Sequence, residues 1–353
     1  MWLFFFKERG KSYTCDSLKK CIPMAFNRLF VIFFFILGIS SARGQDPHFS
    51  QFYANPLYLN PAFAGVKQCP KVNVNYRNQY PTLGVYQTYS VSFDQYVDAL
   101  NGGVGVLIVQ DEAANGALSL TEASLIYSYH LAVSRKFSIL FGAQGTFRQR
   151  ALDWGSLTFP DQIDPFYGFV KPTNEIPPDN TVNSHLDLSF GMVGFTENFY
   201  AGITASHVTQ PNEAFLSGNN LPLKISAQVG GTIPIGRKRL YNSLDNLLIP
   251  NIVFQTQGGA SQLTAGMSFN RGLITGGLGY RQALGVLSTN PDALVFIVGL
   301  APNDVPWTFG YSYDYTISPL KNTLGGAHEL TMSYQFPCRT PRTRYNAIKC
   351  PKF

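Results

Sequence analysis

The sequence predicts an all-β fold: a transmembrane, outer-membrane β-barrel of about 14 antiparallel strands with an irregular, plug-like N-terminal segment. Three observations predict it. Charged residues are only 14% of the chain and aromatic residues equal them, whereas about a quarter of a soluble domain is charged. After residue 44 no apolar run approaches the roughly 20 residues that a membrane-spanning helix needs. Apolar and polar residues instead alternate with a period of two, which a helix would not keep. The mean hydropathy of −0.01 fits a wall whose two faces cancel.

Residues 1–44 are expected to be a cleaved leader. A short basic region at Asn27 and Arg28 precedes the apolar stretch 29–39, and small residues follow up to Gly44. Eleven apolar residues are too few to cross a bilayer. Met24 is an alternative start of the natural chain.

The net charge of the chain belongs mostly to this leader. Of 27 Lys and Arg residues and 21 acidic residues, seven and two lie in residues 1–44, which leaves 20 basic against 19 acidic. A nearly neutral mature chain removes the main support for nucleic-acid binding.

The segment of residues 45–70 is expected to be irregular. It begins QDPHFSQFYANPLYLNPAFAG, with three prolines among several aromatic residues. Each proline removes a backbone donor and fixes φ, so this stretch fits neither an amphipathic helix nor a regular strand.

The barrel itself is expected over residues 71–336. Trp307, Phe309 and Tyr311, for example, alternate with polar or small residues, and other stretches repeat the pattern. The fourteen candidate strands are 71–80, 85–96, 102–110, 117–131, 136–150, 183–196, 199–208, 223–233, 251–257, 262–270, 273–281, 293–300, 307–316 and 328–336.

Connection lengths predict the orientation. Most connections after even-numbered strands are short and most after odd-numbered strands are longer, with 151–182 the longest; 234–250 and 258–261 break the rule. Bacterial barrels have short periplasmic turns and longer outer loops. Both termini, including a basic tail at 337–353, are therefore expected in the periplasm. Basic residues at that side are either a periplasmic docking face or ordinary solubilising charge; the candidates are Arg237, Lys238, Arg239, Arg342 and Arg344.

Two polar residues of the first strand are expected to face the lumen. Arg77 and Gln79 alternate with the apolar side of that strand, and lipid would penalise an arginine by about 2–4 kcal/mol at mid-depth. They are either ordinary lumen polarity or hydrogen-bond partners of the proline-rich segment, whose backbone groups need partners.

The cysteines suggest one disulfide. Closure of an even-stranded barrel brings the start of the first strand beside the end of the last, so Cys69 and Cys338 are expected to meet in the oxidising periplasm. Cys350 is the competing partner for Cys69.

No catalytic, metal or cofactor motif is present. The sequence lacks HExxH, CxxC, GxSxG and the phosphate-binding GxxxxGK pattern. The five histidines are scattered. We expect no enzyme activity and no cofactor.

The opening segment resembles the PorP/SprF family of the Bacteroidota type IX secretion system. The shared elements are the Gln-Asp-Pro start, the Phe-Ser-Gln step and the Asn-Pro-Leu-Tyr-Leu-Asn-Pro-Ala pattern before Gly65. Tyr76 to Pro81 and the final strand are also similar to the family, with Tyr80 where the family usually has Trp. The motif residues are Gln45, Asp46, Pro47, Phe49, Ser50, Gln51, Asn55, Pro56, Leu57, Asn60, Pro61 and Gly65.

This resemblance implies a non-enzymatic outer-membrane component of a Gram-negative bacterium that supports secretion or surface attachment of particular cargo proteins, in some cases linked to gliding motility. The implied partners are the type IX translocon, periplasmic lipoprotein and ring components, cargo with a C-terminal sorting domain, and outer-membrane lipids. The alternative is a porin or hydrophobic-solute channel with the N-terminal segment as a hatch.

Overall fold

The computed structural model describes residues 5–8, 11–14, 22–23, 46–82, 86–164, 166–215, 220–235, 246–285, 289–302, 305–318 and 325–338. The chain divides into two compact units, Met1–Gln45 and Asp46–Phe353. In the first unit, β1 (Phe5–Glu8), β2 (Lys11–Thr14) and β3 (Ile22–Pro23) form a small antiparallel sheet. Within the described residues, no helix is long and apolar enough to cross a membrane.

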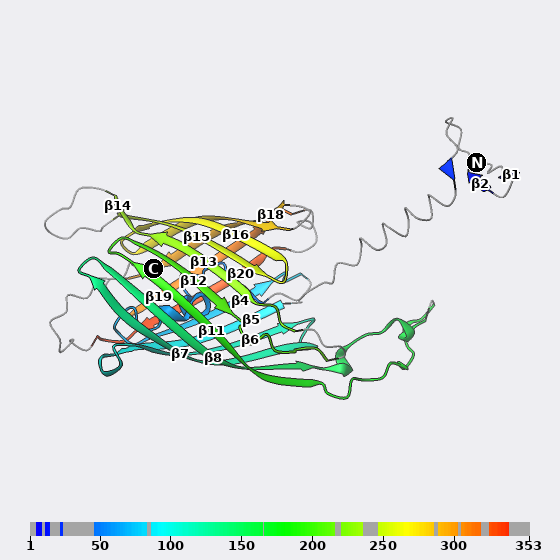
Figure 1. Cartoon of the computed structure of the whole chain (residues 1–353), viewed down its shortest axis with the longest axis horizontal. Coiled ribbons are helices and arrows are strands. Elements are labelled where there is room, and N and C mark those ends of the chain that lie inside the picture. The colour runs from blue at the N-terminus through cyan, green and yellow to red at the C-terminus, as the bar shows by residue number, and fades with distance from the viewer. Residues whose placement is uncertain are drawn as a thin grey trace. The chain divides into compact units, whose positions relative to one another are not determined.

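The second unit is a closed antiparallel β-barrel (Figure 1). Every strand pairs with its neighbours in sequence, and the first, β4, also pairs with the last, β20. The wall strands are β4 (Lys71–Gln79), β5 (Tyr86–Val97), β6 (Gly102–Ala113), β7 (Leu118–Ser134), β8 (Phe137–Leu152), β11 (Val182–Phe195), β12 (Phe199–Ser206), β13 (Lys224–Gly231) with its continuation β14 (Ile233–Ile235), β15 (Asn246–Gln257), β16 (Ala260–Arg271), β17 (Ile274–Leu284), β18 (Thr289–Leu300), β19 (Trp307–Thr316) and β20 (Ala327–Gln335).

Fourteen wall strands confirm the predicted fold. Both β13 and β14 pair with β15, so they form one interrupted strand. Alternation sets the two faces: in β4, Asn73, Asn75 and Arg77 are buried in the lumen, whereas Val74 lies on the outside. The outward side chains are apolar along most strands, as lipid requires.

Several connections differ from the expected lengths, among them the one before β15. Strand β15 begins at Asn246, five residues before the predicted start at 251, because Asn246 to Ile249 continue the ladder with β16. The remainder of the expected connection, 236–245, lies outside the described residues. The long connection 151–182 contains short elements of its own, including β9 (Ile163–Asp164) and β10 (Gly168–Phe169).

The proline-rich segment folds inside the barrel. Pro56 and Pro61 occupy first-turn positions of the short helix α2 (Pro56–Leu59) and the 3₁₀ helix η1 (Pro61–Phe63), where a missing N–H costs nothing. Asn60 caps η1 by accepting a hydrogen bond from the Ala62 N–H at 2.9 Å. The helix η1 packs against β7, β8 and β11, and the apolar residues of the segment are buried with those of the wall.

Candidate functional site

The lumen segment, defined here as residues 46–65, is the candidate site, because two clusters of buried charges hold its start against the wall. The first, the Arg77 cluster, consists of Arg77 (β4), Arg281 (β17), Asp314 (β19) and Glu329 (β20). Arg77 forms ion pairs with Asp314 at 2.8 Å and with Glu329 at 3.0 Å, and Arg281 approaches Asp314 at 2.8 Å. These charges come from strands far apart in the sequence, so only the closed barrel assembles them.

The Arg77 cluster binds the main chain and side chains of Ser50 and Gln51. The two carboxylate oxygens of Glu329 accept the N–H groups of Ser50 at 2.7 Å and of Gln51 at 3.0 Å. The Ser50 hydroxyl donates to Asp314 at 2.6 Å and accepts from Arg77 at 2.9 Å. Charge-assisted hydrogen bonds of this kind are the stronger ones. Wall residues therefore supply hydrogen-bond partners to backbone groups of the segment that have none within its irregular conformation.

Gln51 and His48 extend this contact. The Gln51 amide donates to the carbonyl of Glu329 at 3.1 Å and accepts from the hydroxyl of Thr331 at 3.0 Å. Burial and the neighbouring Arg281 guanidinium hold the pKa of His48 well below its usual range. The neutral His48 ring can therefore accept the hydrogen bond from Arg281 at 2.9 Å.

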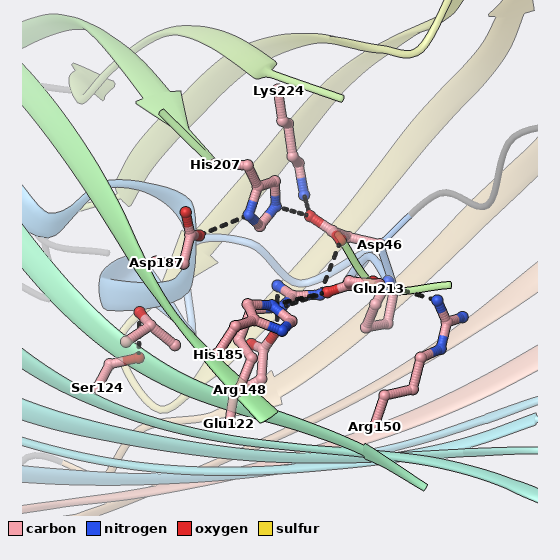
Figure 2. Close-up of polar contacts among 12 residues, drawn as sticks. Asp46, Glu122, Ser124, Arg148, Arg150, His185, Asp187, His207, Glu213 and Lys224 are labelled. Atoms are coloured by element: carbon pink, nitrogen blue, oxygen red, sulfur yellow. Dashed lines mark hydrogen bonds and ion pairs between the residues drawn. The ribbon is translucent and has the colours of Figure 1, made fainter. Parts of the chain in front are cut away.

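The second, the Asp46 cluster, surrounds the first described residue of the barrel unit (Figure 2). The Asp46 carboxylate lies 2.6 Å from His207 Nε2, 3.3 Å from Lys224 Nζ and 3.6 Å from Arg148 Nη2. On its other side His207 contacts Asp187 at 2.7 Å through Nδ1. The backbone N–H of Asp46 donates to Gln257 at 3.1 Å.

The pKa values of His207 and Asp46 favour an ion pair of the protonated imidazole with the ionised carboxylate. Burial lowers the pKa of His207, but the carboxylates of Asp46 and Asp187 outweigh burial and raise it to about 9. Burial raises the pKa of Asp46, but His207 and Lys224 outweigh burial and hold it well below its usual range. His207 is therefore protonated at neutral pH and donates from both ring nitrogens.

Arg148 connects the Asp46 cluster to the loop that follows β12. Besides Asp46, it pairs with Glu122 of β7 and with Glu213 of the loop, the latter at 2.9 Å. Glu213 also accepts from Arg150 at 3.1 Å and lies 3.2 Å from His185. Figure 2 shows these side chains converging on the lumen from β7, β8, β11 and the loop.

Glycines on the wall make room for the second half of the segment. A Cβ on Gly142 would lie 2.2 Å from the Ala62 nitrogen, and one on Gly191 would lie 2.0 Å from Asn60 Oδ1. Strand glycines often mark such a close backbone approach. Wall hydroxyls then reach the segment's carbonyls: Ser128 donates to Ala62 at 2.8 Å and Thr204 donates to Leu59 at 3.2 Å.

The segment leaves the lumen at the end of the barrel where β4 begins. The Gly65 N–H donates to Asp94 at 3.0 Å, and Cys69 is joined to Cys338 by a disulfide just before β4 and after β20. Asp46 lies toward the other end, because its partners His207 and Gln257 stand where β12 and β15 finish. Asp46 and the Cys69–Cys338 disulfide therefore lie toward opposite ends of the lumen, whereas Gln45 and the tail 339–353 lie outside the described residues.

Several predicted residues can now be located. Arg77 contacts the segment, whereas Gln79, two residues along the same face, makes no hydrogen bond to it within the described part of the chain. Cys350 and the predicted docking residues lie outside the described residues, as does Gln45; the docking residues are Arg237, Lys238, Arg239, Arg342 and Arg344.

Sequence reasoning did not assign the partners Arg281, Glu329, His207 and Glu213. For Arg281 and Glu329 the signal is an ionisable residue at a lumen-facing position of an alternating strand, but this signal does not say which charges meet. His207 and Glu213 lie in the loop after β12, where alternation gives no signal.

The arrangement is one of structural anchoring. Both nitrogens of His207 face carboxylates, so neither is free to act as a base toward a hydroxyl. Over the residues that the structure describes, no group of three or more His, Cys, Asp or Glu side chains could hold a metal ion.

Fold and site together define an outer-membrane β-barrel whose lumen is occupied by its own N-terminal segment. The family model "Type IX secretion system membrane protein PorP/SprF" matches residues 41–334. The chain belongs to this family. A comparison with curated proteins found no match.

Solved structures that are similar are also outer-membrane barrels. The TodX deltaS2S3 mutant monoaromatic hydrocarbon channel is 10% identical, with 79% of this chain and 93% of that chain covered and a TM-score of 0.43. A FadL homologue of Pseudomonas aeruginosa is 13% identical with the same coverage and a TM-score of 0.40. CdiB from Acinetobacter baumannii is 9% identical over 76% of this chain and 60% of its own, with a TM-score of 0.41. At these TM-scores the likeness says nothing about what this barrel binds or transports.

Proposed function

We propose that this protein is a non-enzymatic, outer-membrane adaptor of the type IX secretion system. In this role it supports secretion or surface attachment of particular cargo proteins, in some settings as part of gliding motility. Its partners are the translocon, periplasmic lipoprotein or ring components, and cargo with a C-terminal sorting domain. Membership of the PorP/SprF family supports the assignment of this protein to the type IX secretion system.

One observation carries the adaptor role: the lumen holds an ordered segment that is bound by buried charges along its length. Glu329 binds its backbone near the start, and Asp94 binds it near the end. A barrel filled in this way is suited to present surfaces rather than to conduct solutes, because displacing the segment would break the buried hydrogen bonds that its backbone N–H groups donate to Glu329 and Asp94.

The orientation belongs to the same proposal. Short turns and the disulfide end face the periplasm, and the long connection 151–182 faces the cell surface. The C-terminal tail after Cys338 is then periplasmic. Asp46 lies in the outward half of the lumen, and Arg148 joins it there to Glu213 of an outer loop.

The alternative function is a porin or hydrophobic-solute channel that uses the lumen segment as a hatch. Planar-bilayer recording separates the two functions. The adaptor predicts no steady conductance from the purified full-length protein, whereas a steady open state at low voltage favours the porin.

Deletion of the gene tests the adaptor directly. We expect one or a few proteins with type IX sorting domains to disappear from the cell surface and medium, measured by quantitative mass spectrometry, and to return when the gene is restored. An unchanged set of secreted and surface proteins would overturn the proposal.

A further inference from the structure

The outer arm, residues 153–181, of which the structure describes all but residue 165, joins β8 to β11 and extends away from the barrel rim (Figure 1). It lies at the end of the barrel opposite the Cys69–Cys338 disulfide, because β8 finishes there and β11 begins there. Its base is fixed to the wall by the hydrogen bonds from Leu152 to Thr181 and from Asp153 to Ala117, both 2.8 Å.

Acidic side chains organise the arm from within. Asp161 accepts from the Asn174 N–H at 2.7 Å and from the Thr173 hydroxyl at 3.1 Å, which joins the outgoing half of the arm to the returning half. Asp164 accepts from the Phe166 N–H at 2.9 Å and pairs with Lys171 at 3.2 Å. The Phe166 N–H and Lys171 also lower the pKa of Asp164, so it remains charged. These contacts hold the described residues of the arm together without any contribution from a partner.

The tip of this arm is apolar and uncovered. The exposed fractions are 92% for Phe166, 80% for Tyr167, 62% for Phe169 and 61% for Val170, with Ile176 at 83% on the returning half of the arm. These residues lie beyond the wall strands, so the outward-facing lipid contact of the barrel does not explain them. Several large apolar side chains grouped on a soluble projection mark a site of interaction.

The charge of the arm narrows the class of partner. Between residues 153 and 181 there are five acidic residues and one lysine. Glu175 and Asp179 are exposed. An acidic arm is repelled by an anionic lipid surface, and two copies of the same acidic arm repel each other. A basic, apolar protein surface complements both features.

We propose that the outer arm is a docking element for a cell-surface protein that has an apolar cleft bordered by Lys and Arg residues. Phe166 and Phe169 enter the cleft, and the acidic residues face its rim. Because internal hydrogen bonds already restrain the arm, binding costs less conformational entropy than it would for a free loop. The location of the arm at the cell surface rests on the orientation given under Proposed function. The apolar and acidic character of the arm does not depend on that orientation.

Photocrosslinking in intact cells tests the arm. The probe is p-benzoylphenylalanine in place of Tyr167, and the matched control carries it in place of Asn115, an exposed turn residue between β6 and β7 at the same end of the barrel. We expect one protein adduct from the arm and none from the control. The F166S/F169S double variant should lower the yield of that adduct by about tenfold or more, as loss of an apolar anchor does.

Charge variants complete the test. The E175K/D179K variant should also give a lower yield of the adduct than the unchanged arm. In isolated outer membranes, 0.5 M salt should lower the yield of crosslinking as well. The adduct's identity must fit: mass spectrometry should find a surface protein with basic residues around an apolar cleft. Adducts with lipopolysaccharide or with a second copy of this chain, no adduct at all, or a yield unchanged in F166S/F169S would each overturn the proposal.

A separate measurement keeps the two proposals distinguishable. Tyr167→Cys is treated with a membrane-impermeant maleimide on intact cells. Labelling without a crosslinked partner contradicts the docking role alone, whereas absence of labelling in a folded barrel contradicts the orientation.

Discussion

Arg77 shows at the residue scale how this barrel uses a charge that lipid would reject. Its side chain is 2% exposed and pairs with Asp314 and Glu329 while donating to Ser50. Removing one member of a buried charge group is costly because the remaining charges lose their partner. Arg77 therefore stabilises both the wall seam between β4 and β20 and the seat of the lumen segment.

Arg77→Gln should lower the stability of the folded barrel by about 3–5 kcal/mol, since Asp314 and Glu329 would remain buried with less positive charge. Urea unfolding followed by gel mobility measures this change. Arg135→Gln, in an exposed turn, is the control and should change little. Equal unfolding midpoints for the two variants would contradict the role assigned to Arg77.

His207 predicts a pH dependence of the segment's start. Because its pKa rises from 6.5 to about 9 on folding, its stabilising contribution is complete below pH 6.5 and is lost as the pH rises through 9. The pKa of Asp46 is lowered from 3.8, so its contribution is present above that pH and is lost as the pH falls below it. Arg148 and Lys224 face the pair as further positive charges.

A nitroxide at Pro47→Cys, in a Cys350→Ser background, should be immobile at pH 6 and become mobile above pH 9. In the His207→Gln variant this transition should disappear, because the titrating ring is gone. If the label had the same mobility at pH 6 and pH 10 in the otherwise native protein, His207 would not anchor the segment.

At the scale of elements, β8 supports the segment in two ways along one lumen face. Near its start Gly142 lets the backbone of η1 approach closely, and near its end Arg148 pairs with Asp46. A single strand thus contacts both halves of the lumen segment: Gly142 allows close packing of η1, and Arg148 forms an ion pair with Asp46.

Gly142→Val should displace η1, because its Cβ would meet the Ala62 nitrogen at 2.2 Å. The same substitution at Gly145 is a matched control in the same strand, where a Cβ meets nothing within 4 Å. We expect a lower midpoint of thermal unfolding and faster proteolysis of the segment only for Gly142→Val. The same proteolysis rate in both variants would contradict the close packing of η1.

The disulfide links the elements at the opposite end of the lumen. Cys69 follows the segment and Cys338 follows β20, so reduction should loosen the segment's exit and the β4–β20 seam together. Peptide mapping without reductant should recover the Cys69–Cys338 pair, and Cys69→Ser should lower stability by about 2–4 kcal/mol. A free thiol at Cys69 in protein purified without reductant would rule this pairing out.

At the scale of the whole molecule, the lumen segment joins parts of the barrel that share no strand pairing. Ser50 contacts residues of β4, β17, β19 and β20, whereas Asp46 contacts residues of β8 and β13 and the loop after β12. Because the segment spans the lumen from one side to the other, barrel closure and segment binding stabilise each other.

Deleting Gln45 to Gly65 should therefore either prevent barrel assembly or open a measurable conductance, and it should abolish cargo secretion. Heat-modifiable gel mobility reports assembly, planar bilayers report conductance, and quantitative proteomics reports secretion. A deleted protein that assembles normally, stays closed and still supports secretion would show that the segment is dispensable.

The sequence by itself determined the strand number, the two faces of each strand and the irregular character of the segment. These follow from period-two alternation and from proline, which act within a few residues. Barrel closure was also predictable in outline, which is why the positions of Cys69 and Cys338 could be related before any coordinates.

Only the tertiary structure decided which charges meet and where the segment begins. Arg77 and Glu329 are 252 positions apart, and Asp46 and His207 are 161 apart; their contacts depend on the register of every strand between them. Alternation predicts that the charged residues of the strands face the lumen, but it does not predict at which level along the barrel axis each one lies. Asp46 consequently lies at the end of the barrel opposite Cys338, because the buried charges of β8, β13 and His207 are the partners that neutralise its carboxylate.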